Sequence, residues 1–364
     1  MGKRWNENQH RVADEGRGCG VWGGVKGEGI MENSFYVLAE SKINVTRLHI
    51  STWDLLREDA LIEFGVELEK THDNDIALYL ITPSLEFSKT IRSLHYELSD
   101  QTNSRFIFND TIKSVSPFNK SDNRDGAIVS FDGRGELSIL AAEHEFDGVA
   151  LKIAMQLPER CTERIYIRFL LEIERKTLAI LKHGIARSSY IYDIKINEKR
   201  NLSDVVHKYI TKNKLYFCNI KQCFCFHIIP DNFEISFVDN SKVKAVRKLE
   251  SAFSKYLETV KSLKKDRYII VFNKDESKEG EEKTYSFFSV FNEEIIGTSQ
   301  VIVAVTISIL CNLLFAIGNF RVVRSDNISW FKQVPVEYYC GLIVLVIGVI
   351  YIFFNKRLKN ESTT

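Results

Sequence analysis

The pattern of hydrophobic and polar positions is most uniform towards the end of the chain. No charged side chain occurs between Ile295 and Phe320, and a second stretch, from Tyr338 to Phe354, is also free of charge. A helix needs about 20 mostly apolar residues to cross the hydrocarbon core of a bilayer. The pattern therefore predicts two transmembrane helices, 295–320 and 338–354, which a loop at 321–337 joins into a hairpin.

Three polar side chains interrupt the first predicted span, namely Thr306, Ser308 and Asn312. Ser308 and Asn312 lie on the same face of a helix, and Asn and Ser side chains within a span often hydrogen-bond to a neighbouring helix. We interpret them either as packing contacts within one hairpin or as a helix interface or pore lining between several copies. The expected partners are the lipid bilayer and further copies of the chain. A pore would need several copies, because two helices cannot enclose one.

Ahead of these segments, short apolar runs alternate with amphipathic patterns. The apolar positions of 43–50 change face near Arg47, which predicts a bulged strand. The helical spacing of apolar residues predicts a helix over 52–70. Further strands are expected at 35–39, 75–82, 106–108, 127–131, 136–140, 149–156, 215–229 and 233–238, and further helices at 86–99 and 202–211.

The last third of this region has two distinctive patterns. Apolar residues from Val243 to Leu263 fall on one helical face, and Lys and Arg fill the other, which predicts a basic amphipathic helix. The segments 268–272 and 285–291 alternate as strands around a charged tip, which is typical of a hairpin. The second of these strands leads almost directly into the first predicted span.

These elements predict an α+β mixed cytosolic region of one or two domains, followed by the C-terminal two-helix transmembrane hairpin. The expected divisions are a disordered extension or an early start site at 1–30, a mixed α/β domain at 31–160, a β-rich region with the basic helix at 161–294, the hairpin, and a basic cytosolic tail at 355–364.

Composition adds a few limits. The 24 Phe and 14 Tyr can fill a sizeable core, and the formal net charge of +1 gives no chain-wide basic footprint for a nucleic-acid duplex. The seven cysteines are scattered without regular spacing, which is not typical of a disulfide framework. No secretory signal precedes the folded region, so we expect that region on the cytosolic side of a membrane.

Motifs for catalysis or metal binding are weak. The cluster from Cys218 to His227 has possible zinc ligands, but alternate strand residues are too far apart for one tetrahedral ion. We expect Cys223, Cys225 and His227 on one packed face and the intervening Phe residues on the other. The acidic group around His144 could serve general acid–base chemistry, although a solvated loop explains it as well. No catalytic residue, metal site or cofactor is predicted.

The cations of the predicted basic helix are the best candidates for a ligand site. Lys244, Arg247, Lys248 and Lys255 could bind the phosphates of a ligand or of lipid headgroups. The alternative is a solvated helix face, which explains most runs of charge.

The order of parts, a mixed folded region followed by a short membrane hairpin, resembles transmembrane effectors of bacterial anti-phage systems such as the nucleotide-controlled Hailong type. That resemblance implies an oligomeric ion channel whose cytosolic domain responds to a nucleotide signal. The alternatives are a membrane-tethered enzyme with an unrecognised active site and a membrane scaffold for a partner protein.

Overall fold

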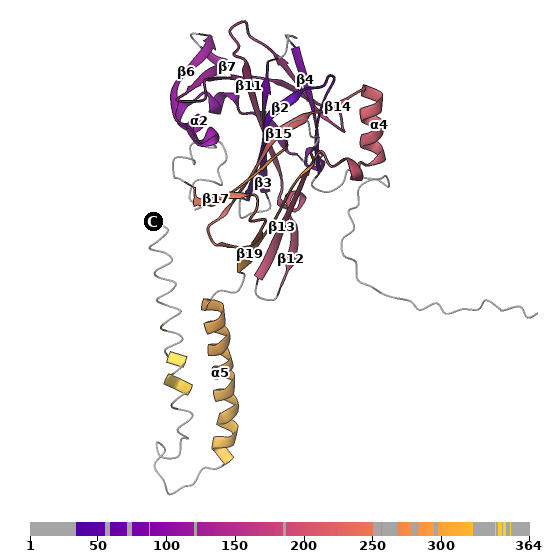
Figure 1. Ribbon diagram of the computed structural model, residues 1–364. Helices are drawn as coiled ribbons and strands as arrows, with labels where there is room; N and C mark the ends of the chain where they lie inside the picture. The colour runs from indigo at the N-terminus through magenta and orange to yellow at the C-terminus, as the bar shows by residue number, and fades with distance from the viewer. Residues whose placement is uncertain are drawn as a thin grey trace, which may run out of the picture.

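The computed structural model describes residues 34–54, 59–70, 75–86, 88–119, 122–184, 187–249, 256, 268–278, 283–294 and 298–322, with a few single residues between 339 and 350. Strands dominate these residues and form two mixed sheets (Figure 1). The first sheet has the order β16 (Phe233–Val238), β19 (Tyr285–Glu294), β13 (Arg187–Ile196), β1 (Ser34–Ala39), β4 (Asp75–Ile81), β10 (Leu151–Gln156) and β9 (Glu143–Phe146), with β12 (Ile180–His183) beside β13 and β14 (Tyr216–Phe217) beside β1.

The second sheet is the larger of the two. Its order is β17 (Val243–Lys248), β18 (Tyr268–Glu276), β15 (Asn219–Pro230), β2 (Asn44–Asp54), β3 (Asp59–Glu69), β11 (Arg164–Glu174), β8 (Glu136–Leu140), β7 (Asp122–Phe131) and β6 (Ile112–Asn119), with β5 (Thr90–Ser93) beside β11. Both sheets contain strands from the predicted 31–160 and 161–294 regions, so the two regions share one hydrophobic core.

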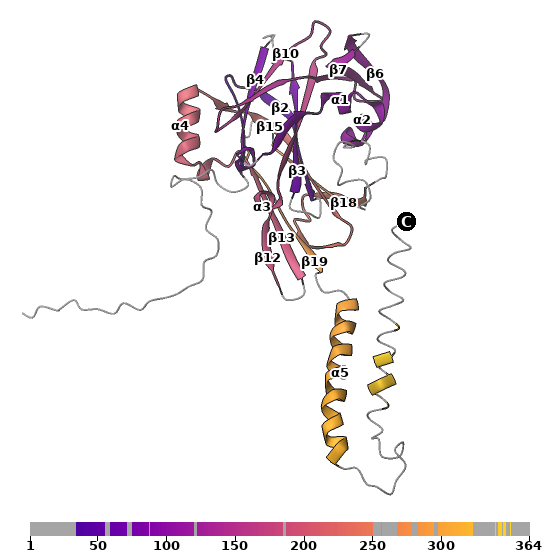
Figure 2. The ribbon, with the colours of Figure 1, turned by 180° about the vertical axis from the view of Figure 1, so that it is seen from behind.

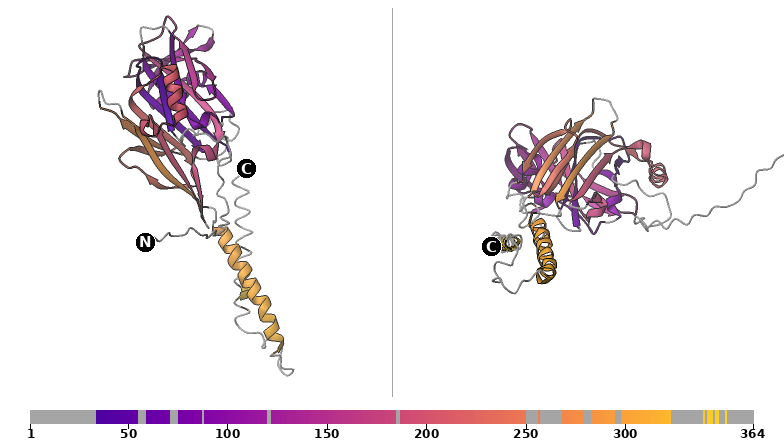
Figure 3. Two further views of the ribbon diagram at one scale, coloured as in Figure 1. Left: turned by 90° about the vertical axis from the view of Figure 1, so that its right-hand side faces the viewer. Right: turned by 90° about the horizontal axis from the view of Figure 1, so that it is seen from below.

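The two sheets pack against each other through that core. Phe35 of β1 contacts Phe64 of β3 with ring centroids 5.3 Å apart, and Tyr192 of β13 contacts His227 of β15. Alternation explains why the strands carry buried residues on this face, since successive side chains of a strand point to opposite sides. Figure 3 shows the resulting layers from the side.

Short helices flank the sheets. In Figure 2, α2 (Gln101–Phe108) lies beside β6 and β7, next to α1 (His95–Leu98), while α4 (Asp204–Asn213) lies on the other side of the molecule. The remaining short elements are α3 (Arg175–Leu178) and the 3₁₀ turns η1 (Pro83–Leu85) and η2 (Lys199–Asn201). The longest helix, α5 (Thr298–Val322), follows β19 and extends away from the sheets (Figure 1).

Several local predictions are confirmed. The pairing of β2 with β3 shifts register between Val45 and Arg47, where the bulge was expected. The strand predicted at 75–82 is β4, and the strands predicted at 127–131 and 136–140 lie in β7 and β8, which pair as an antiparallel hairpin. The predicted helix at 202–211 is α4, with the Ser203 hydroxyl as its N-cap acceptor.

Other local predictions are wrong. Residues 52–70 supply the end of β2 and the whole of β3, because the alternate residues of β3 lie in the core between the sheets. Residues 86–99 contain β5 and α1 instead of one helix, and 106–108 belongs to α2. The expected hairpin of 268–272 with 285–291 does not form, since β18 joins the second sheet and β19 joins the first.

The predicted basic helix at 243–263 begins as a strand. Residues Val243–Lys248 form β17, which pairs antiparallel with β18 at the edge of the second sheet. Of the remainder, only Leu249 and Tyr256 up to residue 263 are described.

The predicted transmembrane hairpin is contradicted. Among the described residues, none of the helices has both the length and the apolar character that a membrane crossing requires. The side chains of α5 are described only as far as Asn312, and the second predicted span only at separate residues from Tyr339 to Ile350. The predicted fold class is therefore corrected to a mainly β architecture of two mixed sheets. The predicted two-span membrane localisation and the predicted channel are contradicted together with the hairpin. The divisions at 1–30, 323–337 and 355–364 lie outside the described residues.

Candidate ligand-binding site

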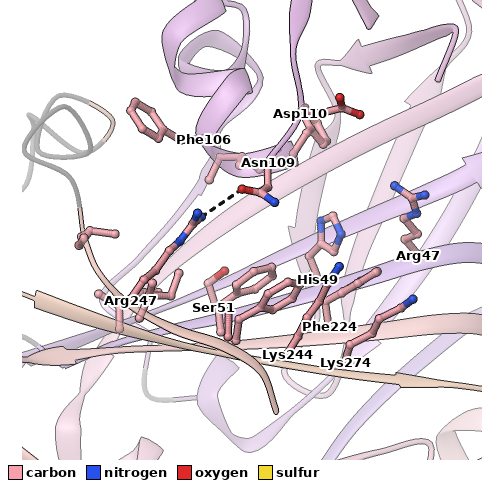
Figure 4. A pocket seen from close by; sticks show the side chains of 18 of the residues that line it. Arg47, His49, Ser51, Phe106, Asn109, Asp110, Phe224, Lys244, Arg247 and Lys274 are labelled. Carbon is pink, nitrogen blue, oxygen red and sulfur yellow. Dashed lines mark hydrogen bonds between the residues drawn. The ribbon is translucent and has the colours of Figure 1, made fainter. Parts of the chain in front are cut away.

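A pocket of about 420 Å³ lies on the face of the second sheet that points away from the first sheet (Figure 4). Its floor consists of alternate residues of β2, β15 and β18, while the residues between them, such as Ile50 and Cys225, lie in the core. The end of α2 and the residues after it form one wall, and β17 forms the rim opposite. The volume falls in the range of roughly 300–1,000 Å³ that is typical of small-molecule sites.

Three phenylalanine rings form the centre of the floor, which we call the aromatic floor. The Phe272 ring stacks on Phe226 with centroids 4.7 Å apart and planes 5° apart, and on Phe224 at 5.8 Å. The Lys244 ammonium lies 5.2 Å from the Phe272 centroid and the Lys274 ammonium 5.7 Å from that of Phe224. Flat apolar faces therefore lie beside positive charge, an arrangement that suits a planar ring carrying an anionic group.

The charge of the lining is strongly unbalanced. Seven of the lining side chains are cations and one, Asp110, is an acid. We call Lys244, Arg247 and Lys248 the β17 cations. Arg247 donates a hydrogen bond of 3.2 Å to the neutral Asn109 amide oxygen, and no carboxylate among the described residues forms an ion pair with any of the β17 cations. Their charge is therefore available to an anion.

The other end of the pocket holds Arg47 and Arg134, which we call the inner arginine pair. Both share the buried Glu67 carboxylate with Arg164, which binds it most closely, at 2.6 Å, against 3.6 Å for Arg134 and 3.8 Å for Arg47. Burial, and then the positive charge of Arg47, lower the pKa of Arg134. Arg134 also lies 3.5 Å from the Asp110 carboxylate, so two carboxylates face three guanidinium groups.

Donor atoms of the inner arginine pair have no acceptor. The Nε atoms of Arg47 and Arg134 are both buried and form no hydrogen bond within the described structure. A buried donor without a partner costs roughly 1–3 kcal/mol.

A buried hydrogen-bond network continues the floor across β2, β3 and β11. Arg168 donates to Glu63, to the Tyr166 hydroxyl at 2.9 Å and to Ser51 at 2.8 Å. Trp53 donates to the other Glu63 oxygen at 2.9 Å. Burial opposes the charge of Arg168, but the adjacent Glu63 carboxylate raises the pKa of Arg168 well above its usual value. The Arg168 guanidinium therefore stays charged, and its bonds to Glu63, Tyr166 and Ser51 fix the floor in place.

His49 joins the floor to this network. Its Nδ1 lies 2.9 Å from the Tyr166 hydroxyl, and its ring packs edge-on against Phe224 at 5.0 Å. Burial, followed by the charges of Arg168 and Arg47, lowers the pKa of His49 well below 6.5. The imidazole is accordingly neutral at pH 7 and adds no positive charge to the pocket.

No family model and no curated protein matches the sequence. The function must therefore be argued from the pocket itself.

The structure places three of the four predicted phosphate-binding residues, Lys244, Arg247 and Lys248, along one rim of the pocket. Lys255 lies outside the described residues. Whether these residues bind phosphate stays a prediction. Sequence analysis did not identify the inner arginine pair, because its members lie on β2 and on the β7–β8 turn, far apart in the chain.

The cysteine and histidine cluster has the expected packed arrangement. Cys223, Cys225 and His227 are buried between the sheets, where His227 Nδ1 lies 2.9 Å from the Thr52 hydroxyl. No group of three potential metal ligands occurs in the described part of the chain. The cluster therefore serves as core.

The two remaining candidate groups lie elsewhere. His144 belongs to the exposed edge strand β9 and packs edge-on against Phe169. In α5, the Thr306 hydroxyl donates to the Ile302 carbonyl at 2.7 Å, while Ser308 and Asn312 are exposed. The predicted pore or helix-interface role of these three residues has no test in the described contacts.

Proposed function

We propose that this chain is a receptor that binds a small anionic ligand with an aromatic ring, of which nucleotides are the leading class. The observation that carries the proposal is the coincidence, in one cavity, of the aromatic floor with an excess of cations that have no carboxylate partner.

Each part of a nucleotide has a counterpart in the pocket. Stacking of a base on an aromatic side chain contributes about 1–3 kcal/mol, and the aromatic floor offers such a surface. Charge-assisted hydrogen bonds from Arg and Lys to phosphate are roughly twice as strong as neutral ones, and both ends of the pocket provide them. His49, held neutral, neither repels these cations nor attracts the phosphate.

The proposal keeps only one part of the resemblance to anti-phage effectors. The pocket agrees with a nucleotide signal that acts on the folded region. The proposal therefore keeps a role for this chain in the response to such a signal. The channel depended on the transmembrane hairpin, which the described helices contradict. The enzyme alternative lacks support, since the His144 group and the cysteine cluster lie outside the pocket.

Calorimetric titration of the full chain with ribonucleoside mono-, di- and triphosphates tests this proposal. We expect saturable binding at one site. Phe272→Ala should weaken it about tenfold, because a lost stacking contact of about 1.4 kcal/mol corresponds to that factor. The double variant K244A/R247A should weaken it further.

The matched control is Lys208→Ala, which removes an exposed lysine of α4, away from the pocket. It should leave affinity unchanged. Binding that Lys208→Ala and K244A/R247A weaken equally would reflect general charge attraction and contradict the proposal, as would the absence of binding by any nucleotide.

A further inference from the structure

One row of side chains on the pocket face of the second sheet is interrupted at Gly65. His49 of β2 pairs in register with Gly65 of β3, and Gly65 pairs with Arg168 of β11, so the three residues form one row across the sheet. The Tyr166 hydroxyl occupies the space beside Gly65, because a Cβ at that residue would overlap the hydroxyl oxygen. Tyr166 thus lies between His49 and Arg168 and bonds to both, at 2.9 Å each.

The hydrogen bonds of Tyr166 fix which nitrogen of His49 carries the hydrogen. A guanidinium group can only donate, so the Tyr166 oxygen accepts from Arg168. Tyr166 is fully buried, and a buried hydroxyl hydrogen without an acceptor would destabilise the fold. Among the described residues, its one available acceptor is His49 Nδ1. Because the imidazole is neutral and its Nδ1 accepts, its hydrogen lies on Nε2.

The Nε2 atom of His49 faces the pocket. It forms no hydrogen bond with a described residue, yet it is not sealed off, since His49 lines the cavity. The imidazole packs beside Phe224 and Phe226, with planes at 69° and 83° to the two phenyl rings. Figure 4 shows the ring extending from its strand towards the wall that carries Asn109. A neutral donor therefore lies next to the aromatic floor.

From this geometry we infer that His49 selects ligands whose aromatic ring carries a hydrogen-bond acceptor, such as a ring nitrogen or a carbonyl oxygen. The Nε2–H group donates to that acceptor, and Tyr166 is a positioning residue that holds the imidazole in this tautomer. The anionic group of the ligand binds the cations instead, since charge-assisted bonds to phosphate are stronger. The inference rests on the proposed function and narrows the ligand class to heterocycles such as nucleobases.

NMR of the full chain without ligand tests the tautomer. In protein labelled with ¹⁵N-histidine, His49 Nε2 should have the chemical shift of a protonated ring nitrogen and Nδ1 that of an unprotonated one. The spectrum of His49→Gln assigns these signals by their loss. Tyr166→Phe removes the bond that fixes the tautomer and should move both shifts towards their average. An unprotonated Nε2 in the unaltered chain would overturn the inference.

Binding measurements test the selection. The probes are the four common ribonucleoside 5′-monophosphates and phenyl phosphate, whose ring has no acceptor. By calorimetry, His49→Leu should bind the preferred monophosphate about fivefold more weakly, which corresponds to the roughly 1 kcal/mol of one neutral hydrogen bond. Its affinity for phenyl phosphate should be unchanged. His49→Gln is the matched control, because its amide can donate from a similar position and should keep most of the affinity for the monophosphate.

The outcomes separate the two proposals. If phenyl phosphate binds the unaltered chain as tightly as the preferred monophosphate, or if His49→Leu weakens both probes equally or neither, the inference is wrong while the receptor function stands. If neither the monophosphates nor phenyl phosphate binds, both proposals fail. Thermal unfolding checks the fold of each variant, and the comparison of probes on the unaltered chain decides the test even if His49→Leu does not fold.

Discussion

The two faces of strand β15 have the same backbone and opposite chemistry. Cys223, Cys225 and His227 point into the core between the sheets, where burial raises the pKa of both thiols and lowers the pKa of the imidazole. Phe224 and Phe226 point to the other side, where seven cations line the pocket. The difference shows that one sheet can provide a sealed packing surface and an open binding surface, because the side-chain period of a strand is two.

The largest effect should come from breaking the buried Arg168–Glu63 ion pair beside the pocket floor. Arg168→Leu leaves the Glu63 carboxylate buried without its cation, and we expect a loss of about 3–5 kcal/mol in the free energy of unfolding. Chemical denaturation measures it. Arg187→Leu, an exposed arginine of β13, is the matched control, and equal losses in the two variants would show that the pair does not support the floor.

On the core face, the loss of side-chain volume should lower the stability of the fold. Ile50→Ala creates a cavity between the sheets and should reduce the free energy of unfolding by about 2–5 kcal/mol. Its neighbours on the pocket face stay in place, so nucleotide affinity, measured by calorimetry at a temperature where the variant is folded, should be unchanged. A large fall in affinity would mean that the two faces are not independent.

A third effect concerns pH. Burial lowers the pKa of His227 to about 3, whereas the unfolded chain binds a proton there below about pH 6.5. The free energy of unfolding should therefore decrease as the pH falls from about 6.5 towards 3, by up to about 1.4 kcal/mol per pH unit from this residue. The free energy of unfolding, measured by denaturation at several pH values in that range, should depend less steeply on pH for His227→Gln. An unchanged slope would show that His227 is not held neutral.

The fold was predictable only where a local signal and the tertiary environment agree. The bulge at Arg47, the strand β4 and the capped helix α4 have patterns that no distant contact overrides. The helices expected at 52–70 and from 243 were wrong because their helical spacing is also compatible with strands, and pairing with β11 and β18 decides between them.

The candidate site was predictable in part. Lys244, Arg247 and Lys248 attracted attention as a run of cations, although on a helix that does not form. The inner arginine pair gave no such signal, since Arg47 and Arg134 are isolated in the sequence and meet only where β2 lies near the β7–β8 turn. The aromatic floor combines Phe224 and Phe226 with Phe272 from another strand in the same way.

By itself the sequence determined which residues of β15 share a face, where charge accumulates along the chain and which segments are apolar, because these properties depend on near neighbours. Only the tertiary structure decided that β18 and β19 join different sheets, that one face of the second sheet is sealed, and that cations from β17, from β2 and from the β7–β8 turn lie around an aromatic floor. Those features arise from pairings between strands far apart in the chain, and such pairings depend on the packing of the whole core rather than on any local pattern.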